Sequence, residues 1–241
     1  MDRNRIQRVL VTLAGALIGA SSSVSGGQKP SDTRDAIMRA HDQYASAPLR
    51  FEAAEPKDNA DFVARAERYQ VRLAKGNATI VDGQKAINLE LAGAVAKSIP
   101  AVRNPQPGVK NPAAGNDPRL AKTGVQTYGT VEYKDVYPGV NVVYSGTQRR
   151  LQYDFIVAPG GNYKDITLDF KKARRVWRDG SGNLVIETGA GKIVQRAPRI
   201  YQDTPQGRQI IPGGYLRKGT NQFGFTIGPH DPKLPLVIDR P

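Results

Sequence analysis

Short runs that alternate apolar and polar residues fill the chain from Leu49 onward. In 87–91 (Ile-Asn-Leu-Glu-Leu) and 151–157 (Leu-Gln-Tyr-Asp-Phe-Ile-Val) the apolar residues recur at every second position. Because successive side chains of a strand point to opposite faces, each run predicts a strand with one buried face. Turn residues separate the runs, and no helical pattern of about 10–15 residues lies between them. The pattern predicts an all-β fold: one multi-stranded antiparallel β-sandwich-like domain, with a short N-terminal helix.

The segment 125–160 gives the clearest local prediction, which is strand, Pro138-Gly139 corner, strand, turn, strand. Further strands are expected over 62–63, 69–73, 78–81, 87–91, 166–170, 175–177, 184–186, 192–195, 198–202, 209–211, 215–217, 223–227 and 235–238. Residues 99–124 are expected to form a long irregular stretch, because their prolines exclude a central strand. Long loops in compact domains are usually functional or flexible. This stretch is therefore a candidate binding surface, and the alternative is a segment that wraps across a sheet face.

The N-terminus has the pattern of a targeting segment. Arg3, Arg5 and Arg8 precede an apolar stretch over 9–20 that is short for a bilayer span, and small residues follow up to Gly26. We expect a cleaved signal peptide at 1–25, a linker and short helix at 26–47, and the β domain at 48–241. The alternative is an uncleaved membrane anchor. A mature chain would work in the periplasm, at the cell surface or outside the cell.

Composition limits the chemistry and indicates a type of partner. The absence of cysteine excludes a disulfide scaffold, a thiolate metal site and a cysteine nucleophile, and two histidines supply a metal site or a catalytic triad poorly. The net charge is +13, and without residues 1–25 it is 32 − 21 = +11. Such a surface attracts polyanions, although a positive charge can also serve solubility alone.

The densest basic clusters are the candidate contacts for a polyanion: Arg149, Arg150, Lys171, Lys172, Arg174 and Arg175. The clusters lack the interleaved aromatic residues of a single-strand nucleic-acid platform, which argues against nucleic acid. An envelope protein, an anionic polysaccharide or peripheral contact with a membrane fits better, and no cofactor is expected.

Two carboxylates could form a catalytic acid pair. Asp135 and Asp154 would suit glycoside hydrolysis if both lined one cleft. The structural alternative is that Asp135 holds the Pro-Gly corner and that Asp154 points away from the apolar face. In the same way, 179–183 (Asp-Gly-Ser-Gly-Asn) resembles a calcium loop but has too few oxygen ligands, so a β-turn is expected.

The central segment resembles the β-rich domain found N-terminal to SBBP β-propeller repeats in bacterial surface proteins. Its hallmark, Y-x-x-V-x-Y-x-D-V-Y-P-G-I-D-L-V-Y-Y-G followed by L-E-Y-D-F-x-V-x-P-G, is matched by Tyr128, Val131, Tyr133, Asp135, Val136, Tyr137, Pro138, Gly139, Val143, Tyr144, Leu151, Tyr153, Asp154, Phe155, Val157, Pro159 and Gly160. The resemblance extends over about 48–239. It implies an exported envelope or surface domain without enzymatic activity, which serves as an interaction or structural module.

The chain departs from that pattern at two positions. Asn141 stands where Asp is usual and Gln152 where Glu is usual, so a cation site in relatives would be weakened here. The sequence also stops at Pro241, where relatives would continue into the propeller. The sequence thus predicts a non-catalytic exported β domain that binds an anionic polymer or a partner protein. A polysaccharide-active hydrolase using Asp135 and Asp154 is the alternative.

Overall fold

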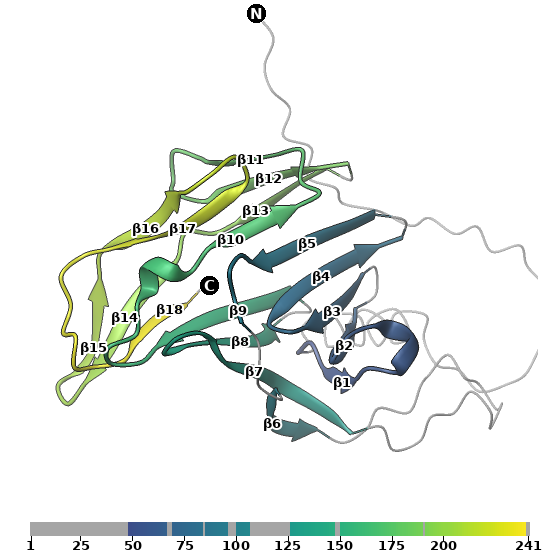
Figure 1. Cartoon of the computed structure of the whole chain (residues 1–241), viewed down its shortest axis with the longest axis horizontal. Helices are drawn as coiled ribbons and strands as arrows, with labels where there is room; N and C mark the ends of the chain where they lie inside the picture. The colour runs from purple at the N-terminus through teal and green to yellow at the C-terminus, as the bar shows by residue number, and fades with distance from the viewer. Residues whose placement is uncertain are drawn as a thin grey trace, which may run out of the picture. The chain divides into compact units, whose positions relative to one another are not determined.

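The computed structural model shows an antiparallel all-β domain (Figure 1). It describes residues 48–66, 69–83, 85–95, 100–106, 126–147, 150–189 and 191–239. All of them belong to the compact unit Asp42–Pro241. The predicted signal peptide and the predicted short helix within 26–47 lie outside the described residues.

The described residues up to Val157 form nine strands and one short 3-10 helix. They are β1 (Phe51–Ala53), η1 (Pro56–Asp58), β2 (Phe62–Arg65), β3 (Gln70–Ala74), β4 (Asn77–Asp82), β5 (Lys85–Leu91), β6 (Ala101–Gln106), β7 (Thr127–Tyr137), β8 (Val140–Thr147) and β9 (Arg150–Val157).

The second half adds η3 (Tyr163–Asp165), β10 (Leu168–Lys171), β11 (Arg175–Arg178), β12 (Leu184–Thr188), β13 (Gly191–Gln195), β14 (Arg199–Thr204), β15 (Gly207–Ile211), β16 (Gly213–Arg217), β17 (Gln222–Ile227) and β18 (Leu236–Asp239). Strands β11, β12 and β13 form a separate three-stranded sheet. The other strands form one large sheet in the order β15-β14-β18-β9-β8-β7-β1-β2-β3-β4-β5-β10-β17-β16, with β6 paired to β7.

The large sheet folds back on itself to give two layers. Strand β7 pairs with β1 at its start, through Phe51 opposite Tyr128, and with β8 over the rest of its length. It therefore links β1–β5, β10, β17 and β16 to the layer of β8, β9, β18, β14 and β15 (Figure 1). The strands at the two ends of this order, β15 and β16, follow each other in the chain and are joined by Pro212.

A chain of aromatic rings fills the space between the layers. Neighbouring ring centroids lie 5.6–6.1 Å apart, within the usual range for aromatic pairs. The rings, in order, are Tyr133, Tyr144, Tyr153, Phe155, Phe225 and Tyr215, and all are buried. The contact between Phe155 of β9 and Phe225 of β17 joins the two layers directly. This aromatic chain confirms the predicted inward face of β9.

The Pro-Gly corner between β7 and β8 has the backbone that the sequence indicated. Gly139 has φ +69°, and a Cβ there would meet the Gly161 backbone at 3.0 Å. A residue with a side chain would therefore be strained and crowded at this position. Asp135 also has a positive φ, 49°, inside a register shift between Tyr133 and Tyr137. The corner thus includes a β-bulge, which the alternation pattern alone does not reveal.

The prediction of an irregular stretch over 99–124 is wrong for the first residues of that range. Residues 101–106 form β6, which includes Pro105 and pairs with β7 alone. Proline is tolerated there because an edge strand leaves one side of its backbone unpaired. The remainder, 107–124, lies outside the described residues, so its role as a binding surface stays a prediction.

Candidate anion-binding site

Of the basic residues predicted to contact a polyanion, one lysine is neutralised by a carboxylate and several others are exposed. Lys171 Nζ lies 2.8 Å from Asp169, and this hydrogen bond and charge raise the pKa of Lys171. Arg149 lies outside the described residues. The ion pairs in the described part of the chain include none of the remaining predicted contacts, which are Arg150, Lys172, Arg174 and Arg175.

Two further cations join them from the small sheet. In the sheet register Arg175 lies opposite Glu187, and Glu187 lies opposite Lys192. Trp177 lies between the two cations: the Arg175 guanidinium is 5.3 Å from its ring centroid and Lys192 Nζ is 5.4 Å from it. Such cation–π contacts hold each charge near the tryptophan without neutralising it. Arg196 follows directly after β13 and is exposed.

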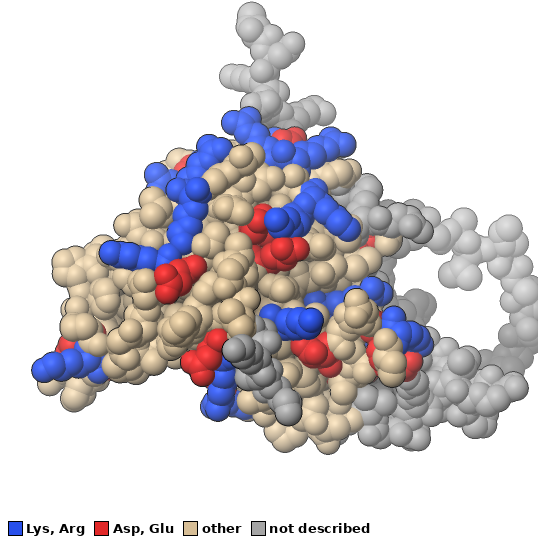
Figure 2. All heavy atoms as spheres, in the orientation of Figure 1, with Lys and Arg blue, Asp and Glu red and all other residues tan. Residues whose placement is uncertain are grey.

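We call Arg150, Lys172, Arg174, Arg175, Lys192 and Arg196 the basic face. Residues 171–199 carry eight Lys or Arg against two Asp or Glu, a net of +6 out of +13 for the chain. Figure 2 shows Lys and Arg gathered along the edge of the molecule that holds β11–β13. A large share of the net charge is therefore concentrated on this side.

A cavity of about 650 Å³ opens beside the basic face. Its floor is the inward face of β4 and β5, and its walls are the start of β9, Phe170 of β10, and strands β12 and β13. The apolar lining consists of Tyr69, Ala78, Ile80, Ala86, Ile87, Leu89, Leu151, Tyr153, Phe170, Ile186, Ile193 and Val194. We call it the β9–β13 cavity.

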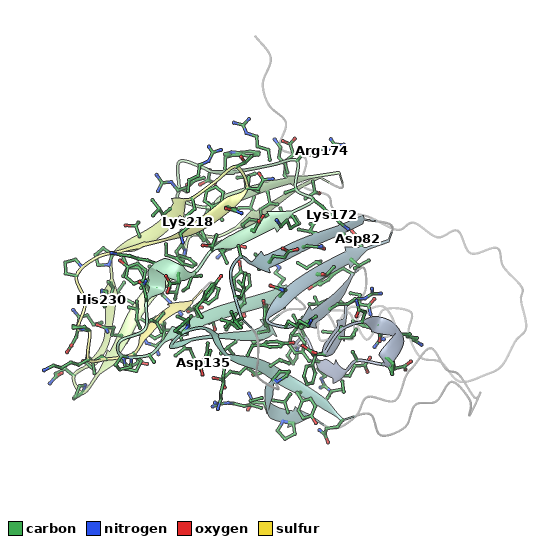
Figure 3. All side chains as sticks on the ribbon, in the orientation of Figure 1. Asp82, Asp135, Lys172, Arg174, Lys218 and His230 are labelled. Atoms are coloured by element: carbon green, nitrogen blue, oxygen red, sulfur yellow. The ribbon has the colours of Figure 1, made fainter. Side chains whose placement is uncertain are left out.

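Charged side chains at the β9–β13 cavity are mostly basic. Arg150, Lys172, Lys192 and Arg196 line it, with the Lys192 ammonium near the Trp177 ring, and Asp82 is the one acidic residue among its described lining residues. Figure 3 shows Lys172 and Asp82 close together at one end of β4, β5 and β10, with Arg174 further along the same side. The cavity is therefore an apolar space with a positively charged rim.

Sequence reasoning missed Lys192, Arg196 and the cavity itself. Strands were predicted over 175–177, 184–186 and 192–195, but not the register that places Lys192 in one row with Glu187 and Arg175. No comparable signal reveals the cavity, because it arises from the packing of β4 and β5 against strands far away in sequence.

The two candidate catalytic carboxylates lie on β7 and β9, which are separated by β8. Asp154 lies opposite Val143, on the face directed away from the aromatic chain. Asp135 is exposed, and its backbone N–H donates to Asn141 Oδ1 at 3.0 Å. Neither carboxylate lines the β9–β13 cavity. The β9–β13 cavity is therefore not a cleft that these two carboxylates share. Hydrolysis by this pair stays a prediction.

The other motif residues stabilise the fold through buried hydroxyls. Tyr133 Oη donates to Asp61 Oδ2 at 3.0 Å, and Tyr144 Oη donates to the Gly76 carbonyl at 2.7 Å. Tyr137 Oη donates to the Ala92 carbonyl at 2.9 Å and accepts from the Thr167 N–H. Burial raises the pKa of Tyr133, and it raises the pKa of Tyr137 to about 12. Buried phenols are expected to find such partners.

The described residues do not supply a metal centre. They contain no group of three or more His, Cys, Asp or Glu that could hold an ion. In the 179–183 turn the Asp179 carboxylate accepts from the N–H groups of Ser181 and Asn183, both at 2.9 Å, and from Asn183 Nδ2 at 3.0 Å. These bonds, the Asn183 side chain first, lower the pKa of Asp179. The segment is the predicted β-turn, and its carboxylate is occupied by the turn itself.

Comparisons with known proteins place the whole domain in one family. Among the described residues, no helix has the length and hydropathy that a membrane span requires. Comparison with the curated proteins and with the solved structures gave no match. A family model described as Domain of unknown function (DUF7948) matches residues 41–240. That match spans well over half of the chain, so the chain belongs to the DUF7948 family.

Proposed function

We propose that this chain is an exported, non-catalytic interaction module of the cell envelope or cell surface, which binds an anionic partner through the basic face. The observation that carries the proposal is the net +6 of residues 171–199, gathered around β11–β13. Lys171 of this region is paired with Asp169 and Arg199 with Asp239, whereas the ion pairs of the described residues include none of Lys172, Arg174, Arg175, Lys192 and Arg196.

The resemblance to the β-rich domain that precedes SBBP propellers supports the surface location. The motif around Tyr133 and Tyr153 folds into three antiparallel strands with a Pro-Gly corner, as the alternation pattern predicted. The basic, apolar and small-residue regions over 1–25 support export. An anionic polysaccharide, an acidic envelope protein and an anionic membrane surface are the partners that this charge would recognise.

Clustering matters because the interaction of exposed charges falls off within about 10 Å at 0.1 M salt and about 3 Å at 1 M. Scattered cations would each act alone under these conditions. Cations that share one face can contact several negative charges of the same polymer at once, so that their attractions add. Binding through the basic face should therefore be strong at low salt and lost at high salt.

The test compares two triple variants that have the same net charge. One removes charge from the basic face, by Lys172→Gln, Arg174→Gln and Lys192→Gln. The other removes charge elsewhere, by Lys57→Gln, Lys75→Gln and Lys233→Gln, three exposed residues outside the basic face. Both are applied to immobilised heparin, a defined polyanion, and eluted with a salt gradient that starts at about 0.05 M.

We expect the wild type and the control triple to elute at similar salt, and the basic-face triple to elute at clearly lower salt. Equal losses in the two triples would show that only net charge matters and would refute the assignment to the basic face. Failure of the wild type to be retained at low salt would refute polyanion binding altogether. Circular dichroism of each variant checks that it is folded.

A further inference from the structure

We infer that the β9–β13 cavity holds the acyl chain of a single anionic amphiphile, whose charged head lies among Arg150, Lys172 and Arg196. This inference rests on the proposed function, because part of the basic face forms the rim of the cavity. It narrows the anionic partner from a polymer to a ligand with an apolar chain and a negative head group.

The walls favour an apolar chain. Ile80 and Ile87 pair across β4 and β5 on the inward face, yet both remain partly exposed because the opposite layer does not cover them. Ile193 lies opposite Ile186 in the sheet register, lines the cavity and is 40% exposed. Exposed aliphatic side chains that surround one space gain free energy when a hydrocarbon chain replaces the water.

The size and the shape of the lining also fit such a ligand. Pockets for small ligands usually have volumes of about 300–1,000 Å³, an apolar lining and a few polar groups that orient the ligand. The β9–β13 cavity, at about 650 Å³, lies in the middle of this range. Its cations stand on different elements: Arg150 begins β9, Lys172 follows β10, and Arg196 follows β13. They therefore surround a head group at the rim instead of lying along one strand.

Polar side chains in the walls are already engaged within the protein. Thr188 Oγ1 donates to the Gly191 carbonyl at 2.9 Å. Gln195 Nε2 donates to Tyr215 Oη at 2.8 Å, and Gln195 Oε1 accepts from Tyr153 Oη at 3.2 Å. A sugar or an extended peptide needs several hydrogen bonds from such groups. A hydrocarbon chain needs none, so these contacts favour the amphiphile.

The experiment measures binding by isothermal titration calorimetry, with probes below their micellar concentrations. Dodecyl phosphate and dodecanoate carry the same chain with different anionic heads, dodecyl maltoside has a neutral head, and inorganic phosphate has no chain. We expect one dodecyl phosphate per protein, weaker binding of the maltoside and no binding of inorganic phosphate. Shortening the phosphate series from twelve to eight carbons should weaken binding by about fourfold per methylene.

A pair of double variants separates the chain from the head. Ile87→Ser with Ile193→Ser changes the floor and one wall of the cavity without changing charge. Ile210→Ser with Leu216→Ser changes two exposed residues that do not line it, 58% and 48% exposed. The wall variant should bind dodecyl phosphate about tenfold or more weakly, while its heparin elution stays at the wild-type position. The control variant should match the wild type in both assays.

Three results would overturn the inference. Affinity that does not depend on chain length would show that the head group alone is bound. A wall variant that binds like the wild type would place the chain elsewhere. Self-association of the wild type in light scattering, abolished in the wall variant, would show that a second copy occupies the cavity. If heparin retention depends on the basic face but dodecyl phosphate does not bind, the cavity inference fails and the proposed function stands; if neither probe binds, both fail.

Discussion

Truncation of Phe155 tests whether the aromatic chain holds the two layers together. Phe155 is fully buried, and its ring lies 5.9 Å from both Tyr153 and Phe225. Phe155→Ala removes the ring from a site that the surrounding strands cannot easily fill. A loss of about 3–5 kcal/mol in the free energy of unfolding is expected. Because single domains are usually stable by about 5–15 kcal/mol, this is a large fraction of the total.

Urea unfolding followed by circular dichroism measures this loss. With a slope of about 2–3 kcal/mol per molar urea, the midpoint should fall by about 1–2 M. Fluorescence of Trp177, the only tryptophan, reports separately on the small sheet. Coincident transitions from the two probes would show that the small sheet unfolds together with the layers.

Two further variants make the result decisive. Ile210→Ala removes a side chain that is 58% exposed, so its stability should stay within about 0.5 kcal/mol of the wild type. Phe155→Leu keeps most of the apolar volume and should lose less, about 1–2 kcal/mol, which leaves a folded variant if the alanine variant does not fold. A loss below about 1.5 kcal/mol in Phe155→Ala, with an unchanged slope, would refute the layer-bridging role.

Tyr144→Phe should lower the free energy of unfolding by about 1–3 kcal/mol, because the buried Gly76 carbonyl loses its donor. Tyr163→Phe, at a half-buried ring, should be nearly neutral in the same urea assay; equal losses in both would contradict the argument. Tyr137 has its pKa raised to about 12 by burial, so its contribution to stability is complete below about pH 10, where the unfolded phenol titrates, and is lost as the pH rises toward 12. Tyr137→Phe should therefore flatten the fall of stability between pH 10 and about 12, and an unchanged slope in urea midpoints over this range would exclude Tyr137 as its source.

The sequence predicted most accurately those strands that have one buried face and one face directed outward. The alternation over 151–157 located β9 and its buried residues, since one face meets the aromatic chain and the other is directed away from it. Strand β6 escaped prediction because Pro105 breaks the usual composition, yet the strand needs hydrogen bonds on one side only. Glu132 shows a second limit: it is 5% exposed, although alternation places it on the outward face.

Candidate site residues were predictable only where neighbours in sequence are also neighbours in space. Lys172, Arg174 and Arg175 stand out as one run of charges. Lys192 and Arg196 join them because β12 and β13 fold back beside β11, a consequence of hairpin register. The β9–β13 cavity depends on β4, β5, β9 and β13 at once, and the uncovered part of the β4–β5 face is set by packing that no local pattern encodes.

The departure at Asn141 has a structural cause that the motif alone hides. Its Oδ1 accepts the Asp135 N–H at 3.0 Å, and its Nδ2 donates to Glu132 Oε1 at 2.9 Å. An aspartate could accept the first bond, but it would face the buried Glu132 carboxylate with a like charge and no proton to donate. The other oxygen of Glu132 binds the Arg103 guanidinium at 2.8 Å. Asn141 thus completes a corner in which protein groups satisfy the buried carboxylate, so a weakened cation site is not needed to explain this residue.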